Sequence, residues 1–242
     1  MSHYLKSLKK DENTSREYYT SSLKMKSEQQ KFLEKLVTGK AIKPKYIADI
    51  ACGGGGVSAH LYHMFPHAKF TLLDANEKAV LLAEQETGTL DAKYMVGDIY
   101  DLPLQDNTYD MVICWQTLSW LDEPDLALKE LVRICKPGGI IYASSLFNLD
   151  TDVDISSTVI DHSRISSADG ITAKYNTYCI QSLNMWLSGI ITKMQVHKFI
   201  IDIDVIYNGR GLGTSTLRLE SGERIQISAG MLLNWGVLEI IK

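Results

Sequence analysis

Several signals that place proteins in a membrane, a secretory route or a metal-binding class are missing from this sequence. The N-terminal residues contain no apolar core of signal-peptide length, and no later run approaches the roughly eighteen apolar residues of a transmembrane helix. The four cysteines are scattered, without a Cys-x-x-Cys pair or a cluster of histidines beside them. We therefore expect a cytoplasmic protein with reduced thiols, no membrane anchor and no metal.

An excess of positive charge is also missing. The 242 residues include 25 basic and 29 acidic side chains, a formal net charge of −4, with no basic stripe that could follow a phosphate backbone. This balance disfavours nucleic acid as a partner and favours a small molecule or another protein, a second copy of the chain in a homodimer included. Hydrophobic residues make up 45% of the sequence, enough to bury one substantial core.

The most informative segment is residues 47–56, an apolar run that ends in an acid and four consecutive glycines, Ile-Ala-Asp-Ile-Ala-Cys-Gly-Gly-Gly-Gly. This pattern predicts a buried strand followed by a ligand-binding loop, because glycine lets a ligand approach the main chain where any Cβ would collide. A helix predicted at Val57–Phe65, ended by Pro66, would point its N-terminal amides at the same ligand.

Further short apolar runs alternate with helical patterns along the chain. Strands are predicted at Lys69–Asp74, Ala92–Val96, Tyr109–Cys114 and Ile140–Ser144, helices at residues 27–39, Glu77–Glu86 and 124–135, and a turn at Lys136–Gly139. The alternation predicts an α/β fold with a doubly wound, mostly parallel sheet of seven strands and helices on both faces. Ligands bind such sheets beyond the carboxyl ends of the strands. Asp49, Asp74 and Asp98 all stand at such ends.

The two terminal regions are expected to add to this core. Residues 1–21 form a polar arm with the aromatic pair Tyr18-Tyr19, and residues 148–176 lose clear periodicity, which indicates an inserted lid. Toward the C-terminus the pattern predicts a helix at Thr177–Leu187, a strand at Ile201–Val205, a hairpin at Leu217–Ile227 and a last strand at Asn234–Ile241. The hairpin would then be an insertion between the final two strands.

Five short motifs follow one another within residues 27–147, namely Asp49–Gly56, Asp74, Gly97-Asp98, Tyr109–Cys114 and Lys136-Pro-Gly-Gly139. In order and spacing they resemble the motifs of class I S-adenosylmethionine-dependent methyltransferases. The resemblance implies a Rossmann-like sheet with an N-terminal helical lid, and S-adenosyl-L-methionine as the cofactor, released as S-adenosyl-L-homocysteine. Two positions depart from the family pattern: Ala51 stands where glycine is usual, and Val57 stands where some members carry another glycine.

The same glycines allow a second interpretation. Ala51, Gly53 and Gly56, with Asp74 about twenty residues beyond, fit the fingerprint of a dinucleotide-binding loop. This makes an NAD(P)-dependent oxidoreductase the competing hypothesis. The acid at the end of the third strand and the Lys-Pro-Gly-Gly sequence are not part of that fingerprint, so the methyltransferase interpretation is favoured.

The resemblance also implies roles for single residues. Asp74 would accept hydrogen bonds from both ribose hydroxyls, Asp98 would accept one from the adenine amino group, and Tyr19 would fold over the cofactor. The full set of expected cofactor-binding residues is Tyr19, Asp49, Ala51, Cys52, Gly53, Gly55, Asp74, Ala75, Asn76, Gly97, Asp98, Ile99, Cys114, Trp115 and Gln116. Three parts are expected: residues 1–39 as arm and lid helix, residues 40–147 as the cofactor-binding core, and residues 148–242 as the lid insertion and the strands that complete the same domain.

The expected reaction is methyl transfer from S-adenosylmethionine to an oxygen or nitrogen of a small polar acceptor, for example a sugar. The polar acceptor is suggested by the charged residues of the lid, Asp152, Asp154, Asp161, His162, Arg164 and Asp169. His162, Tyr19 and Tyr175 are the candidate catalytic bases, with His162 favoured because its neutral form is available near neutral pH. An RNA methyltransferase and a non-catalytic methyltransferase-like partner subunit are the further alternatives.

Overall fold

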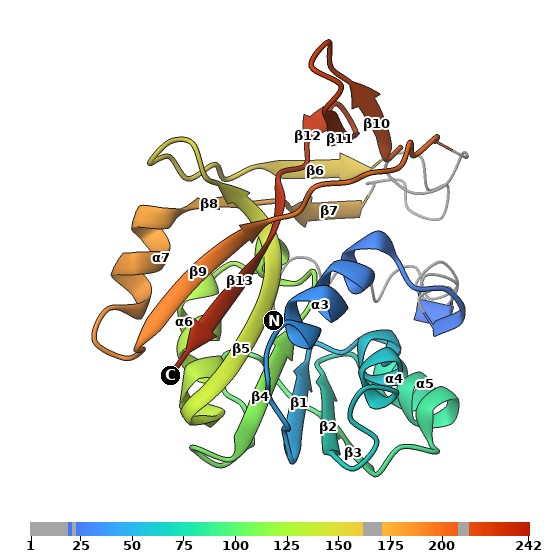
Figure 1. The fold of residues 1–242 in the computed structure, drawn as a ribbon, viewed down its shortest axis with the longest axis vertical. Coiled ribbons are helices and arrows are strands. Elements are labelled where there is room, and N and C mark those ends of the chain that lie inside the picture. The colour runs from blue at the N-terminus through green and yellow to red at the C-terminus, as the bar shows by residue number, and fades with distance from the viewer. Residues whose placement is uncertain (1–18, 21–22, 162–170, 208–212) are drawn as a thin grey trace.

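The computed structural model describes residues 19–20, 23–161, 171–207 and 213–242. Its central feature is a twisted sheet (Figure 1), whose strands β1 to β5 are Tyr46–Ile50, Lys69–Asp74, Ala92–Val96, Tyr109–Cys114 and Cys135–Asn148. Two later strands, β9 (Lys193–Lys198) and β13 (Trp235–Ile241), extend it to the order β3-β2-β1-β4-β5-β13-β9. A short strand β8 (Thr177–Cys179) pairs with β5 outside this path, as the eighth strand of the sheet.

The pairing confirms the predicted mostly parallel α/β sheet. β1 pairs in parallel with β2 and β4, β2 with β3, and β4 with β5, whereas β13 is antiparallel to both of its neighbours. Four of the five residues of β1 and five of the six residues of β2 are buried. Strands covered on both faces need apolar side chains on both, which is why these segments read as continuous apolar runs in the sequence.

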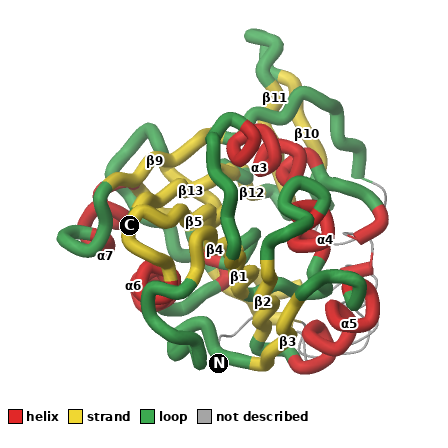
Figure 2. Tube along the Cα trace, turned by 60° about the horizontal axis from the view of Figure 1, so that its bottom comes forward, coloured by secondary structure: helices red, strands yellow, loops and turns green. Residues whose placement is uncertain are grey.

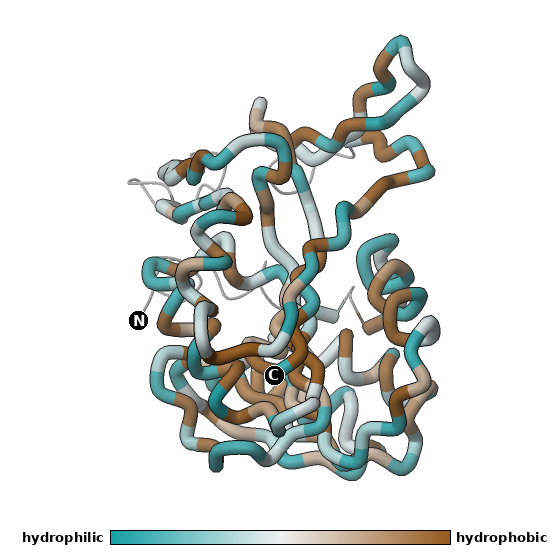
Figure 3. Tube along the Cα trace, turned by 60° about the vertical axis from the view of Figure 1, so that its left-hand side comes forward, coloured by the Kyte–Doolittle hydropathy of each residue, from teal (hydrophilic) through white to brown (hydrophobic). Residues whose placement is uncertain are grey.

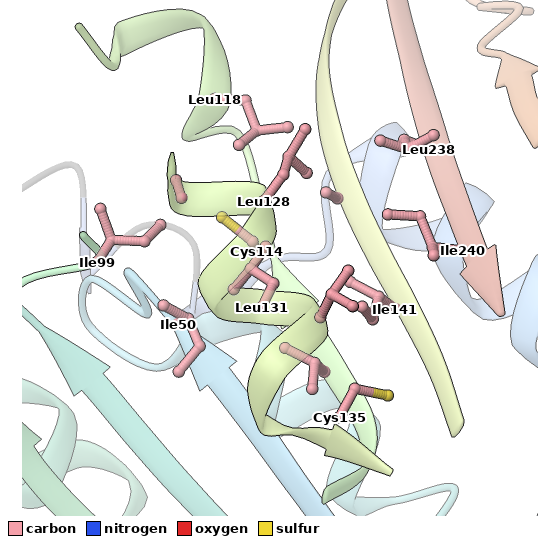
Figure 4. Packing of buried hydrophobic residues seen from close by; sticks show 14 of the residues in the cluster. Ile50, Ile99, Cys114, Leu118, Leu128, Leu131, Cys135, Ile141, Leu238 and Ile240 are labelled. Atoms are coloured by element: carbon pink, nitrogen blue, oxygen red, sulfur yellow. The ribbon is translucent and has the colours of Figure 1, made fainter. Parts of the chain in front are cut away.

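Within the described residues, five α-helices from α3 onward pack on the two faces of the sheet, and Figure 2 shows their arrangement from a second direction. They are α3 (Glu28–Thr38), α4 (Gly56–Tyr62), α5 (Glu77–Thr87), α6 (Pro124–Ile134) and α7 (Ile180–Leu187). Leu33 of α3 and Leu61 of α4 belong to one buried cluster, and Leu131 of α6 and Leu183 of α7 belong to another. The two clusters therefore lie on opposite faces of the sheet. Figure 4 shows the second, in which α6 packs over β4 and β5.

Two small antiparallel sheets cover the carboxyl ends of the parallel strands (Figure 1). One pairs β6 (Thr158–Asp161) with β7 (Ile171–Lys174), and the other contains β10 (Ser215–Arg218), β11 (Arg224–Ser228) and β12 (Met231–Leu232). The β10–β11 hairpin forms where it was predicted and pairs Leu217 with Ile225. It lies in sequence between β9 and β13, the last two strands of the central sheet, as expected. It projects from the body of the molecule, and hydrophobic and hydrophilic segments alternate along this projecting end (Figure 3).

The predicted strand at Ile201–Val205 is wrong. The strand that completes the sheet is β9, whose Met194 and Val196 alternate with Lys193 and Gln195 and pack on the core. Residues 201–207 form a connection without regular secondary structure instead, and Asp204 binds the hairpin: its Oδ1 accepts a hydrogen bond from Arg224 Nε at 2.6 Å. The alternation of isoleucine and aspartate there reflects contacts with the hairpin rather than a half-buried strand.

Three predicted boundaries also differ. The helix expected at Thr177–Leu187 begins only at Ile180, because Thr177–Cys179 is strand β8. Lys136–Gly139 is not a free turn but a bulge within β5, where the register with β4 shifts between Tyr109 and Met111. The helix after the glycines ends at Tyr62, and the chain turns before Pro66. In each case a strand pairing or turn overrides a local pattern that favoured another structure.

The three predicted parts of the chain remain a prediction. The described residues do establish that β9 and β13 join the sheet formed by β1 to β5, so its strands come from both halves of the sequence. None of the described helices combines the length and the hydropathy that a bilayer span requires.

One buried ion pair joins the end of α3 to the sheet. Lys40, which follows the Gly39 cap of α3, places its Nζ 2.7 Å from Glu239 Oε1 on β13. The Glu239 side chain is only 5% exposed, and its other oxygen lies 3.1 Å from His197 Nε2. A buried carboxylate that loses a charged partner is costly, so this contact helps to hold the lid helix in place.

We predict that Lys40→Met lowers the free energy of unfolding by about 1–2 kcal/mol, because Glu239 stays buried while its half-exposed partner is lost. Lys31→Met is the matched control, since Lys31 pairs with Glu28 on the exposed surface of the same helix. Urea unfolding of both variants measures the effect. Equal stabilities of the two variants would show that the Lys40 pair contributes no more than a surface contact.

Candidate functional site

The glycine loop, residues 51–56, connects β1 to α4 at the carboxyl edge of the sheet. Cys52 N donates to Leu73 O at 3.0 Å, which fixes the start of the loop on β2. Gly53 and Gly55 have φ angles of +54° and +79°, a region that favours glycine. A Cβ on Gly55 would lie 3.1–3.3 Å from Leu72, Thr87 and Ala83, so even a methyl group is crowded there.

Ala51, which stands where the family usually has glycine, adopts a backbone conformation that favours glycine. Its φ is +59°, in the left-handed region, where alanine costs roughly 1–2 kcal/mol relative to its ordinary conformation. Glycine avoids that cost. Alanine therefore keeps the shape of the loop at the expense of some backbone strain, which is a common property of ligand-binding turns.

Tyr19 lies directly on the glycine loop. A Cβ built on Gly53 would stand 2.8 Å from Tyr19 Cε1, and one built on Gly54 would stand 2.8 Å from Tyr19 Cβ. The structure thus brings this predicted residue to the loop from a distant part of the sequence. Its neighbour Tyr18 lies outside the described residues.

Asp74, the last residue of β2, binds the loop through its carboxylate. Oδ2 accepts a hydrogen bond from Gly53 N at 2.9 Å, and Oδ1 accepts one from Asn76 N at 2.8 Å. The residue is 8% exposed. Burial raises the pKa of Asp74, while the hydrogen bonds from the Asn76, Gly53 and Ala75 amides act in the opposite direction. Asn76 also caps α5, because its side chain accepts from Lys78 N.

Asp49 lies beneath the loop with one unsatisfied oxygen. Oδ2 accepts a hydrogen bond from Ser58 Oγ of α4 at 2.7 Å, and Oδ1 is buried without a partner among the described residues. Burial raises the pKa of Asp49 from 3.8 to about 7, and the charge of Asp74 adds to the rise. A buried acceptor of this kind favours a ligand that brings a positive charge or a hydrogen-bond donor.

The predicted residues after β3 differ in their surroundings. Gly97 N donates to Asp74 O at 3.1 Å, which links the ends of β2 and β3. The Asp98 side chain is exposed, and its Oδ1 accepts from Tyr100 N at 3.2 Å. Ile99 is 8% exposed and belongs to the core. Asp98 thus lies at the same edge of the sheet as Asp74, with its side chain exposed.

Cys114 ends β4 with its side chain inside the protein. The thiol packs among Leu118, Leu131 and other core residues (Figure 4), and burial raises its pKa to about 12. It therefore remains a neutral thiol. If Cys114 contacts a ligand at the sheet edge, it does so through its main-chain atoms, because its thiol points into the core.

Trp115 and Gln116 connect the end of β4 to the lid helix. Gln116 has a φ of +53°, its N donates to Ser144 Oγ at 2.6 Å, and its side-chain amide donates to Gln29 of α3. Trp115 is 8% exposed, and its indole Nε1 is buried without a partner within the described ranges. Gln29 and Ser144 are the site residues that sequence reasoning missed. No periodicity marks them, because their roles arise only from packing.

The catalytic candidates come from separate elements. Tyr175 packs edge-on against Trp120, with ring centroids 4.3 Å apart, and joins a buried cluster with Leu146 and Trp235. Tyr19 lies on the glycine loop. His162 lies outside the described residues, as do Arg164 and Asp169. Nothing in the geometry therefore chooses among the three.

One acid of the lid already has a structural role. Asp154 accepts hydrogen bonds from Cys179 N at 2.7 Å and from Ser182 Oγ at 2.5 Å, and so caps the start of α7. It is not available to a polar acceptor. Within the described ranges, no three histidine, cysteine, aspartate or glutamate side chains are grouped so that they could hold a metal ion.

The comparison with known families agrees with this geometry. Residues 48–143, which run from β1 through β5, match the sequence profile of the family described as "Methyltransferase domain". Over residues 48–143 the chain is therefore similar to the S-adenosylmethionine-dependent methyltransferases. This similarity favours the methyltransferase interpretation of the glycines over the dinucleotide interpretation.

Individual relatives are similar over the same region. The malonyl-[acyl-carrier protein] O-methyltransferase of Hahella chejuensis is 28% identical over 103 residues, 43% of this chain and 37% of that protein. The fatty-acid O-methyltransferase of Mycolicibacterium smegmatis is 28% identical over 98 residues, 40% of this chain and 36% of that protein. The chain thus matches little more than a third of each relative's length.

The crystal structure of an S-adenosylmethionine-dependent methyltransferase from Methanosarcina mazei superimposes with a TM-score of 0.56, at 16% identity, over 85% of this chain and 96% of that one. At this level of identity the likeness concerns the fold alone.

The residues present fit the cofactor of this family. S-adenosylmethionine carries a ribose diol and a cationic methionine end, and the edge of the sheet offers a carboxylate, Asp74, and a buried unpaired oxygen, Asp49 Oδ1. The loop between them accepts no side chain at Gly53 or Gly55 without crowding. An acid, a glycine turn and an unsatisfied acceptor at one edge are the features such a molecule requires.

We predict that Asp49→Asn changes how stability depends on pH. Because the pKa of Asp49 is raised from 3.8 to about 7 in the folded protein, its neutral form stabilises the fold fully below pH 3.8. That contribution is lost as the pH rises through 7. Asparagine stays neutral, so the variant should gain roughly 2–4 kcal/mol over the wild type between pH 4 and pH 8.

Urea unfolding of both proteins across this range measures the difference. Stability curves that run parallel from pH 4 to pH 8 would contradict a raised pKa at Asp49.

Proposed function

We propose that this protein transfers a methyl group from S-adenosylmethionine to an oxygen or nitrogen of a small-molecule acceptor. The observation that supports this most is the arrangement around the glycine loop, where Tyr19 covers the loop, Asp74 binds it and Asp49 keeps a buried oxygen unpaired. These groups lie at the carboxyl edge of the parallel strands, where ligands of doubly wound sheets bind.

The bound cofactor would supply an activated methyl group. The residues of the chain would bind and orient it: Asp74 through the ribose, Asp49 through the cationic methionine end, and Asp98 through the adenine. Tyr19 and the main chain after β4, at Trp115 and Gln116, would exclude water from the methyl group. The protein's main contribution to the rate is then alignment of the acceptor rather than chemical activation.

The names of the similar proteins support oxygen as the accepting atom. Both relatives described above are O-methyltransferases, one named for a malonyl-acyl-carrier protein and one for a fatty acid. Since each is matched over little more than a third of its length, their substrates do not carry over. A small acceptor, no nucleic acid partner and a cytoplasmic location belong to the same proposal.

We predict that Asp74→Asn weakens S-adenosylmethionine binding by roughly 1.5–3 kcal/mol, because the amide loses the charge and one of the two acceptor oxygens. Calorimetric titration measures the affinity. Asp91→Asn is the matched control, since Asp91 is an exposed acid away from the loop. Unchanged affinity in a folded Asp74 variant would remove the ribose role from this residue.

We predict that His162→Ala depresses turnover and removes an inflection from the pH–rate profile, while cofactor affinity stays within about twofold of the wild type. The assay follows transfer of label from methyl-labelled S-adenosylmethionine into fractionated small metabolites.

Tyr175→Phe is the companion variant, which loses only a hydroxyl. Loss of the inflection in Tyr175→Phe instead would assign the base to Tyr175. Cofactor binding without label in any fraction would favour a non-catalytic partner subunit, and label in RNA alone would reject the small-molecule acceptor.

A further inference from the structure

We propose that the acceptor is a neutral aromatic molecule carrying a hydroxyl or amino group, and that it binds in a groove beneath the small β10–β11–β12 sheet. The assignment of this ligand as the methyl acceptor rests on the proposed function. The chemical class of the ligand follows from the side chains that line the groove.

The groove lies between the carboxyl end of β5 and the inserted hairpin. Phe147, Phe199, Leu233 and Trp235 line it from the side of the central sheet, and Ile225 and Gln226 line it from β11. Its empty volume is about 630 Å³, open solvent included.

The groove adjoins the cofactor end of the site through two shared residues. Phe199 and Trp235 also line a second, smaller cavity, together with Gln29 of the lid helix and Trp115 after β4. The ring of Phe32 on α3 packs edge-on against Phe199 at 5.5 Å. Phe199 and Trp235 therefore separate a molecule in the groove from Trp115. Trp115 is one of the residues proposed above to exclude water from the methyl group.

The charges at the groove argue against an anionic ligand, since the lining also includes the acid Asp150. Two cationic side chains line it, and both are already paired: Lys198 Nζ lies 3.4 Å from Glu223 Oε1, and Arg224 Nε lies 2.6 Å from Asp204 Oδ1. An anionic ligand would have to displace these acids. A carboxylate substrate such as a free fatty acid is therefore disfavoured.

Among the polar side chains of the groove, which include Asp150 and Asn234, Gln226 argues for a hydrogen-bond donor on the ligand. Gln226 Oε1 is buried and has no hydrogen-bond partner among the described residues. A hydroxyl or amino group that donates to it would remove the cost of that unsatisfied acceptor. A hydroxyl-rich sugar would instead place many polar groups against Phe147, Phe199 and Trp235, whereas an aromatic ring packs well on such faces.

The test uses binding of simple probes and does not depend on turnover. The probes are 2-naphthol, which can donate a hydrogen bond, 2-methoxynaphthalene, which cannot, and octanoate, an anionic chain. Wild type, Gln226→Leu and the control Gln195→Leu are titrated with each probe by ligand-observed NMR. Gln195 is an exposed glutamine on β9 outside the groove.

We expect the wild type and Gln195→Leu to bind 2-naphthol about fivefold more tightly than 2-methoxynaphthalene, and Gln226→Leu to lose that preference. Octanoate should bind more weakly than either. If Gln226→Leu does not fold, Phe199→Leu replaces it and should weaken both naphthalene probes equally. The proposal is overturned if the wild type shows no preference, if the preference survives Gln226→Leu, or if octanoate binds most tightly.

Titration of the same wild-type protein with S-adenosylmethionine separates the two proposals. A protein that binds 2-naphthol through Gln226 but not the cofactor would contradict the proposed methyl transfer while supporting the ligand class of the groove. A protein that binds the cofactor but fails the naphthalene comparison would contradict only the groove.

Discussion

The parallel pairing of β1 between β2 and β4 is the constraint on which the whole site depends. It brings the end of each strand to one edge, so that the loop after β1, Asp74 of β2 and Gln116 after β4 lie at the same edge although Gln116 follows Ala51 by 65 positions in the sequence. Asp74 then joins two of these ends, because its carboxylate accepts from Gly53 N across the gap. Without that register the same residues would be unrelated surface groups.

The backbone at the carboxyl edge of the sheet is strained at two positions, and contacts with neighbouring elements hold it in that conformation. Ala51 and Gln116 both have positive φ angles, and both lie where the chain leaves a central strand. The amide of Gln116 binds Ser144 of β5 and its side chain binds Gln29 of α3. The conformation after β4 therefore depends on the position of α3, which Lys40 attaches to β13 through the buried carboxylate of Glu239. The carboxyl edge of the sheet and α3 are thus joined by one continuous set of contacts.

The core could be predicted from the sequence, whereas the acceptor region could not. Strands buried on both faces, such as Lys69–Asp74, are apolar throughout and end at acids or glycines, so pattern and structure coincide. Beyond residue 148 the decisive contacts are nonlocal. The Ile201–Val205 alternation arises from Asp204 bound to Arg224, and Gln29 reaches the site only because α3 packs on the sheet. Such contacts leave no periodic signal.

The insertion between β9 and β13 explains why the family match does not identify the methyl acceptor. Residues 48–143 carry the family match, but the groove is built by Phe199, Gln226 and Trp235, which lie outside it. β13 must run antiparallel to β5 to enter the sheet, and this places Trp235 opposite Leu146, at the edge where β5 ends. The segment that precedes β13 therefore has to pass over the carboxyl end of β5. A hairpin inserted there becomes a wall of the groove. Under the proposal made above, its sequence would then determine the acceptor while the cofactor edge stays the same.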